Sequence, residues 1–111
     1  MYTRYELYLD GEPQDVGFMV GLNELDLDYE IQDYIMEDFN ANLPFPKISE
    51  KHQKQIPLAY FTEKGLERFQ KSIQQLLDVY ETYNFFDVVK IEESLFDKTI
   101  IYEDQYQVVA I

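Results

Sequence analysis

The clearest structural signal in the chain is the segment TEKGLERFQKSIQQLLDVYETY, residues 62–83. Its apolar side chains recur at intervals of three and four residues, which places them on one side of an α-helix. Thr62 precedes the first turn and belongs to the residue types that cap helix N-termini well. We therefore predict a helix from Thr62 to about Tyr83 with one buried face, made of Leu66, Phe69, Ile73, Leu76, Leu77 and Tyr80.

The residues just before this helix are less regular. Leu58–Phe61 is apolar and is predicted to be either a short strand or an extended approach to the helix. Residues 41–57 contain three prolines, each of which interrupts regular structure. They are therefore predicted to form an irregular connection.

The beginning of the chain predicts a β-hairpin. Tyr2–Leu9 alternates, with Tyr5, Leu7 and Leu9 on one face and Arg4, Glu6 and Tyr8 on the other. Asp10-Gly11 is a turn signal. Pro13 is expected to delay the next strand to about Asp15, which leaves Val16–Val20 as the second strand.

A helical period follows between Glu24 and Asn40. Asn23 is the expected N-cap of this helix, and acidic residues in its first turn favour the helix dipole. Its predicted buried face spans an arc of about 140° at 100° per residue. That face is made of Leu27, Ile31, Tyr34, Ile35 and Phe39.

The last third of the chain predicts three strands. Phe85–Ile91 is rich in aromatic and β-branched residues, and Thr99–Tyr102 with Tyr106–Ile111 forms an expected terminal hairpin. The fold class predicted for residues 1–111, taken as a single domain, is α+β. We expect a small antiparallel sheet with two helices packed on one face.

The composition favours a folded protein of the reducing cytoplasm. The 111 residues fit one domain, and the aromatic fraction of 16% argues against disorder. Cysteine is absent, which excludes disulfides and thiolate metal sites and favours a cytoplasmic location. We expect neither a secretory leader nor a membrane-spanning segment, because no apolar run has the required length.

The charge of the chain is its most unusual property. The formal net charge is −13, with −10 carried by residues 1–46, +3 by residues 47–72 and −6 by residues 73–111. A field of this sign repels nucleic acids and anionic lipids and attracts basic partners. Direct binding of nucleic acid or a membrane surface is therefore not expected, whereas a basic protein partner is.

Four acidic residues concentrate this charge on the helix predicted from Glu24 to Asn40. Asp26, Glu30, Asp33 and Glu37 recur at helical spacing, nearly opposite the apolar face. Like charges at this spacing destabilise a helix slightly, and the segment contains no basic residue to relieve them.

These four carboxylates allow two interpretations. In the first, they form a solvated face that keeps a tyrosine-rich domain in solution. In the second, they dock a basic partner, and an even row of carboxylates that imitates nucleic-acid phosphates would inhibit a DNA- or RNA-binding protein.

The aromatic content suggests a second kind of surface. Ten tyrosines and eight phenylalanines exceed what a small core needs, so some are expected at an interface. Tyr102 and Tyr106, beside Glu103 and Asp104, are the best candidates, and an ordinary cross-strand aromatic pair is the alternative. Such a surface would make the chain a self-associating structural or regulatory subunit. Pairing of the basic residues with the acidic row of a second copy would also give a homodimer.

Catalysis, metals and cofactors have no positive signal. His52 is the only histidine and is read as a solvated loop residue, because no nucleophile elbow accompanies Ser49. The positions Asp26, Asp28, Glu30 and Glu37 imitate a calcium loop, but its sixth position needs glycine and is Ile31. Neither of the glycine-rich phosphate-binding motifs, G-x-x-x-x-G-K-[ST] and G-x-G-x-x-G, is present. The sequence thus favours a non-enzymatic binding protein without cofactor or metal.

Overall fold

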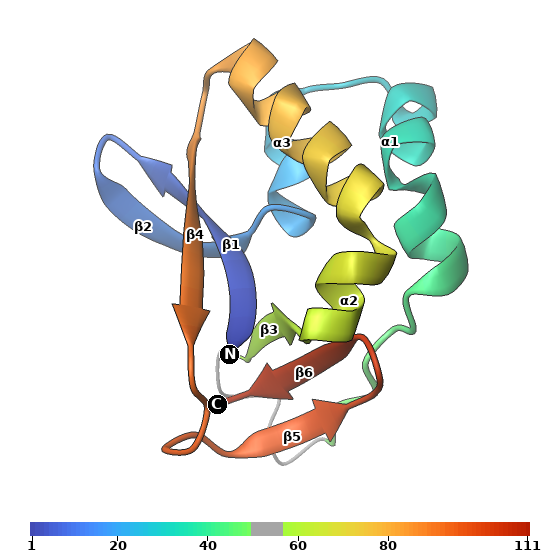
Figure 1. The fold of residues 1–111 in the computed structure, drawn as a ribbon. Helices are drawn as coiled ribbons and strands as arrows, with labels where there is room; N and C mark the ends of the chain where they lie inside the picture. Colours follow the sequence, from blue (N-terminus) through green and yellow to red (C-terminus); the bar gives the residue numbers. More distant parts are fainter. Residues whose placement is uncertain (50–56) are drawn as a thin grey trace.

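The computed structural model describes residues 1–49 and 57–111 as an antiparallel sheet with helices, drawn in Figure 1. The α+β class predicted from the sequence is confirmed. In chain order the elements are β1 (Tyr2–Leu9), β2 (Glu12–Gly17), the 3-10 helix η1 (Val20–Leu25), α1 (Tyr29–Asn42), β3 (Leu58–Phe61), α2 (Glu63–Arg68), α3 (Gln70–Tyr83), β4 (Asp87–Glu93), β5 (Ile100–Glu103) and β6 (Gln107–Ala110).

The strand β1 is the centre of the sheet. Over the described residues the strand order is β2-β1-β3-β6-β5. β2 and β3 pair with different parts of one edge of β1, and β4 pairs with its other edge. β1 has neighbouring strands on both edges, and side chains on both of its faces are buried. Leu7 is fully buried on one face, and Arg4 and Glu6 are buried on the other as an ion pair of 2.7 Å.

The hairpin β1–β2 is confirmed, but its second strand starts earlier than predicted. Asp10 and Gly11 have φ values of 52° and 81°, the positive values that a two-residue hairpin turn uses. β2 begins at Glu12 and includes Pro13, which contradicts the expected start near Asp15. β2 ends the strand order, and proline is tolerated on an edge strand because its missing N–H can face outward.

The predicted 62–83 helix is present in two parts. The side chain of Thr62 accepts a hydrogen bond of 3.0 Å from the Gly65 N–H and so caps α2, as predicted. The helix is interrupted at Phe69, with φ −103° and ψ 16°. Phe69 is fully buried between Phe39 and Tyr106, and this packing outweighs the helical preference of the local sequence. The predicted apolar face is confirmed, with Leu66 and Leu77 partly buried and Phe69, Ile73, Leu76 and Tyr80 buried.

The main core joins the helices to the hairpin. Side chains of β1, η1, α1 and α3 meet in one cluster that includes Leu7, Leu22, Ile35, Phe39, Ile73, Leu76 and Tyr80. The packing is close at Gly21, where a Cβ atom would lie 2.0 Å from Leu7 Cδ1. The expectation that both helices lie on one face of the sheet goes beyond these contacts and stays a prediction.

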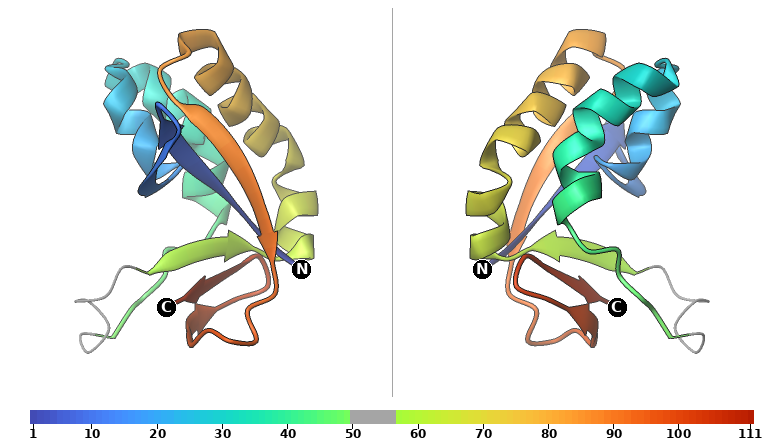
Figure 2. Two further views of the ribbon diagram at one scale, coloured as in Figure 1. Left: turned by 90° about the vertical axis from the view of Figure 1, so that its left-hand side faces the viewer. Right: turned by 90° about the vertical axis from the view of Figure 1, so that its right-hand side faces the viewer.

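A smaller core lies at the other end of the sheet, between β3, β6 and the segment after β4. It contains Tyr60, Leu95, Val108 and Ala110. The predicted terminal hairpin is present as β5–β6. β3 meets β1 through a single residue pair, Thr3 with Phe61, and Figure 2 shows β3 running across the direction of β1.

Candidate functional site

The helix α1 starts later than the sequence predicted. Val20–Leu25 forms η1, which packs Leu22 and Leu25 into the core, and Asp26 then takes a left-handed conformation with φ 55°. The left-handed backbone ends η1, so a continuous helix from Glu24 and an N-cap at Asn23 are both wrong. The Asn23 side chain instead donates a weak 3.4 Å hydrogen bond to the Val20 carbonyl.

The solvent side of α1 combines acidic and aromatic residues. At 100° per residue, Glu30, Asp33 and Glu37 lie within an arc of about 60°, with Tyr29 and Tyr34 about 40° beyond either edge. All five are exposed, and the two tyrosines are 83% and 69% exposed. We call these five residues the α1 surface.

Two of the expected core positions of α1 face water. Ile35 and Phe39 are buried as predicted and Leu27 packs against the core, but Ile31 and Tyr34 are exposed. The predicted apolar face was too wide, because only one side of α1 meets the core. An apolar arc calculated from the sequence does not distinguish a buried tyrosine from an exposed one.

The acidic row is shorter than predicted. Asp26 is exposed but precedes α1, so it does not continue the helical spacing of Glu30, Asp33 and Glu37. From Glu30 to Glu37 the helix rises about 10 Å, against the roughly 16 Å that a helix including Asp26 would give. The structure therefore brings together three of the four predicted acidic site residues on one helix.

Unlike the carboxylates of the α1 surface, the neighbouring Asp38 takes part in an ion pair. Arg68 of α2 contacts Asp38 through two hydrogen bonds of 3.0 and 3.1 Å. These two bonds lower the pKa of the Asp38 carboxyl, and hydrogen bonds from Ser72 and Asn42 lower it further. Burial raises this pKa, but by less than the bonds from Arg68 lower it, so the pKa lies below its usual value. The ion pairs among residues 1–49 and 57–111 are Arg4–Glu6, Arg68–Asp38 and Lys90–Glu92, and none involves the α1 surface.

The basic part of the sequence is only partly described. Lys64, Arg68 and Lys71 are exposed on α2 and α3, and Arg68 is engaged by Asp38. Lys51, His52 and Lys54 lie outside the described residues. Whether this region pairs with the acidic row of a second copy stays a prediction.

Tyr102 and Tyr106 have structural roles at the β5–β6 turn. The Tyr102 hydroxyl donates a 2.6 Å hydrogen bond to Asp104 Oδ2, and Tyr102 lies opposite Val109. Tyr106 precedes β6 and packs edge-on against Phe69, with ring centroids 5.4 Å apart. The two tyrosines do not form a cross-strand pair, and neither belongs to the α1 surface. Their use by a partner stays a prediction.

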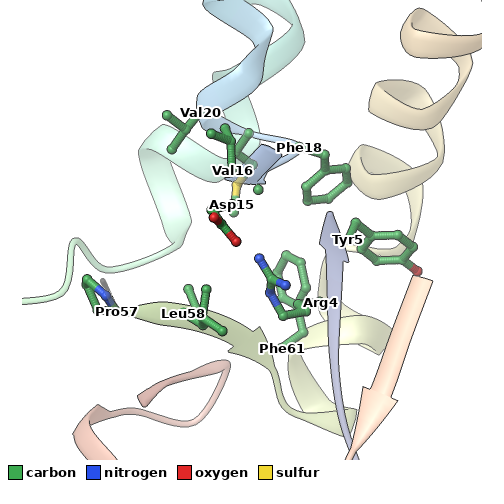
Figure 3. A pocket seen from close by; sticks show the side chains of 12 residues that line it. Arg4, Tyr5, Asp15, Val16, Phe18, Val20, Pro57, Leu58 and Phe61 are labelled. Atoms are coloured by element: carbon green, nitrogen blue, oxygen red, sulfur yellow. The ribbon is translucent and has the colours of Figure 1, made fainter. Parts of the chain in front are cut away.

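A cavity of about 230 Å³ opens where β2 and β3 diverge along β1. Figure 3 shows Arg4 and Asp15 pointing into this space, with Leu58 and Phe61 on one side. Most of the lining is apolar, and the charge of Arg4 is neutralised by Glu6. The cavity has one related signal in the sequence, the opposite charges of Arg4 and Glu6 on one face of β1, and this signal alone does not predict a cavity.

The same face of the sheet holds a buried tyrosine. The guanidinium of Arg4 lies 6.0 Å from the ring centre of Tyr60, and the Tyr60 hydroxyl donates a hydrogen bond to Glu93. Burial, followed by this bond, raises the pKa of Tyr60. Tyr60 and Glu93 do not line the cavity, so the Tyr60 hydroxyl is not presented to it.

Within residues 1–49 and 57–111, no three histidine or acidic side chains converge on a possible metal position. Across the same residues, no helix has the length and apolar character needed to cross a membrane.

No protein-family model matches the chain, and searches of curated proteins and of solved structures found no similar protein.

Proposed function

We propose that this protein is a non-enzymatic binding protein that docks a basic protein partner on the α1 surface. The observation that carries the proposal is the row of Glu30, Asp33 and Glu37, which takes part in no ion pair among the described residues and is flanked by exposed Tyr29 and Tyr34. The proposal places the chain in the cytoplasm, which its lack of cysteine favours.

The chemistry of the α1 surface suits arginine and lysine side chains. Three carboxylates provide acceptors for charge-assisted hydrogen bonds. The two tyrosine rings offer faces for cation–π contacts and apolar area for the stems of long basic side chains. Tyrosine is also enriched among residues that dominate binding energy at protein interfaces. The sequence alone had assigned Tyr34 to the core, so this pairing of rings and carboxylates comes from the structure.

A narrower version of the proposal is nucleic-acid mimicry, in which the partner is a DNA- or RNA-binding protein. The three carboxylates on α1 extend over about 10 Å of helix, and exposed Asp26 and Asp28 precede them. Mimicry predicts that duplex DNA and this protein compete for the same partner. A basic partner that binds the protein in the presence of excess duplex would contradict mimicry and leave basic docking intact.

The test separates the α1 surface from the overall negative charge. The variant Glu30→Gln/Asp33→Asn/Glu37→Gln raises the net charge from −13 to −10. The matched control Asp10→Asn/Glu12→Gln/Glu103→Gln makes the same change at three exposed acids away from α1. Binding of a fluorescent arginine-rich peptide is measured for both by anisotropy across a salt series.

The α1 variant is expected to bind the peptide about tenfold more weakly than the control, because lost charge pairs of about 0.5 kcal/mol each add up. Its affinity should also depend less on salt. The variant Tyr29→Ala/Tyr34→Ala keeps the charge and should weaken binding as well. Equal affinities of the α1 variant and the control would mean that the net charge alone attracts the peptide, and the proposal would be wrong.

A further inference from the structure

The strand β4 has an open edge. β4 pairs with β1 over its whole length, in regular antiparallel register from Tyr2–Glu93 to Tyr8–Asp87. Figure 1 shows β4 beside β1, and among the described residues no strand pairs with its other edge. Proteins commonly shorten such edge strands, interrupt them or place charges on them, lysine especially, to prevent association. β2 contains Pro13, and the β5–β6 register shifts between Ile100 and Tyr102, but β4 has neither feature.

The backbone of β1 shows which groups of β4 point outward. The Tyr5 carbonyl accepts a 3.1 Å hydrogen bond from Phe18, so the peptide groups of Tyr5 face the β2 side. Successive residues of a strand direct these groups to opposite edges, so Arg4 and Glu6 direct theirs to β4. Their partners are Ile91 and Val89. The N–H and C=O groups of the intervening Lys90, and of Glu92, therefore face outward.

The side chains of β4 are complementary to those of a second β4 in one register. A two-fold axis perpendicular to the sheet places residues of the same face opposite each other. With the axis at Ile91, Lys90 lies opposite Glu92 of the second copy, and the two Ile91 side chains face each other. With the axis at Lys90, like charges would meet, because Lys90 would oppose Lys90 and Asp87 would oppose Glu93. Like charges directly opposite each other destabilise a strand pair.

Exposed aromatic residues lie just beyond both ends of β4. Phe85 is 55% exposed two residues before the strand, and Phe96 is 91% exposed three residues after it. In an antiparallel pair the end of one β4 lies beside the beginning of the other. The same axis therefore brings Phe96 of each copy towards Phe85 of the other, which gives both rings an apolar neighbour.

We propose that β4 is a homodimer interface, in which two copies extend the sheet by antiparallel pairing of β4 about a two-fold axis at Ile91. The partner is a second copy of this chain because the charges of β4 complement themselves in this register. The interface is separate from the α1 surface, so a dimer leaves α1 available for a basic partner.

The net charge sets the expected salt dependence. Each copy carries −13, so two copies repel each other over distances that salt screens. The cross-strand contacts are short and partly apolar and are screened less. Added salt is therefore expected to strengthen this dimer, whereas a dimer held by basic residues against the acidic row of α1 would dissociate.

The decisive test exchanges the two charged residues. Lys90→Glu places acids at both positions, and Glu92→Lys places bases at both. Each variant alone is expected to dimerise about tenfold more weakly than the parent, because two attractive cross-strand pairs become repulsive. An equimolar mixture of the two should recover the parental affinity as a heterodimer, in which every pair is again complementary. Sedimentation equilibrium between about 10 µM and 1 mM covers the weak affinities expected of a small interface.

The mixture also excludes an effect on the monomer fold. The Lys90–Glu92 ion pair of 2.9 Å within one strand is lost in both single variants and cannot return on mixing. Recovery on mixing therefore reports contacts between copies. A parent that stays monomeric at 1 mM in 0.3 M salt, or a mixture no more associated than its components, would overturn the proposal. At 0.3 M salt, where the repulsion between copies is screened, the α1 triple variant should dimerise like the parent, so failure of either proposal leaves the other testable.

Discussion

Phe69 interrupts the helix between α2 and α3 and lies at the centre of the core. It is fully buried, it separates α2 from α3, and it packs against Phe39, Phe61 and Tyr106. Its substitution Phe69→Ala is expected to cost about 3–5 kcal/mol of the free energy of unfolding, because neighbours in three separate parts of the fold cannot all move to fill the cavity. Urea unfolding followed by circular dichroism measures this loss. An unchanged midpoint would show that the aromatic cluster is not part of the core.

Gly65 is fixed by a close approach between α2 and the terminal hairpin. A Cβ atom there would lie 2.0 Å from the backbone oxygen of Tyr106. Gly65→Ala is therefore expected to destabilise the protein by about 1–3 kcal/mol, although alanine favours helices over glycine by about 1 kcal/mol. Lys64→Ala is the control on the same helix, since Lys64 is exposed and should change stability little. A Gly65→Ala variant as stable as this control would mean that the hairpin moves freely.

Buried residues were predicted correctly where the apolar pattern continued over several helical turns. The positions Phe69, Ile73, Leu76 and Tyr80 recur over three helical turns, and all are buried. Ile31 and Tyr34 were misplaced because an apolar residue at the margin of an arc is buried only if another element covers it. The left-handed conformation of Asp26 had no signal in the periodicity, which continued through it.

At the scale of elements, the turn between β5 and β6 depends on one carboxylate. Asp104 Oδ1 accepts hydrogen bonds of 2.8 and 3.0 Å from the N–H groups of Tyr106 and Gln107, and Oδ2 accepts one from Tyr102. Burial raises the pKa of Asp104, but these bonds outweigh it, so the net pKa lies below the usual value of 3.8. The ionised carboxylate therefore stabilises the folded state.

The sign of this shift gives a pH prediction. The contribution of Asp104 to the free energy of unfolding is fully present above the ordinary pKa of an aspartate. It is lost as the pH falls through the lowered pKa that Asp104 has in the folded state. Asp104→Asn should reduce the free energy of unfolding by about 1–2 kcal/mol at pH 7, because three bonds to a charged acceptor are weakened. The difference from the parent should shrink below about pH 4. Urea titrations of both proteins between pH 7 and 2.5 measure the difference in their free energies of unfolding. If this difference stayed constant over that range, the charge of Asp104 would not be what stabilises the turn.

The helix α1 is expected to be more stable without its exposed carboxylates. Glu30→Gln/Asp33→Asn/Glu37→Gln removes like charges at helical spacing, each pair of which costs a few tenths of a kcal/mol. Thermal unfolding at low salt should therefore show an equal or slightly higher midpoint. A midpoint lowered by several degrees would indicate that these carboxylates have stabilising partners.

At the scale of the whole molecule, the net charge of −13 should make stability depend on salt. Screening of self-repulsion between about 10 mM and 0.3 M NaCl should raise the free energy of unfolding. The α1 triple variant and the control Asp10→Asn/Glu12→Gln/Glu103→Gln both carry −10 and should show a smaller rise. Stability that falls with salt would mean that attractive ion pairs dominate the field.

The class of the fold could be predicted from the sequence, but the order of its strands could not. Alternation and turn signals located the strands to within a few residues in most cases. Which strands pair is decided by contacts between distant residues, such as Thr3 with both Phe61 and Glu92. The cavity beside Arg4 and the open edge of β4 both follow from that order, so neither could be predicted from local patterns.

The position of β1 between β2 and β4 has a consequence for synthesis of the chain on the ribosome. β1 is synthesised before β4, which pairs along its whole second edge and follows only after β2, η1, α1, β3, α2 and α3. Until then β1 has only the hairpin with β2 and the single pairing of Thr3 with Phe61 of β3, and an isolated hairpin is marginally stable in water. The second edge of β1 therefore stays unpaired until β4 has been made.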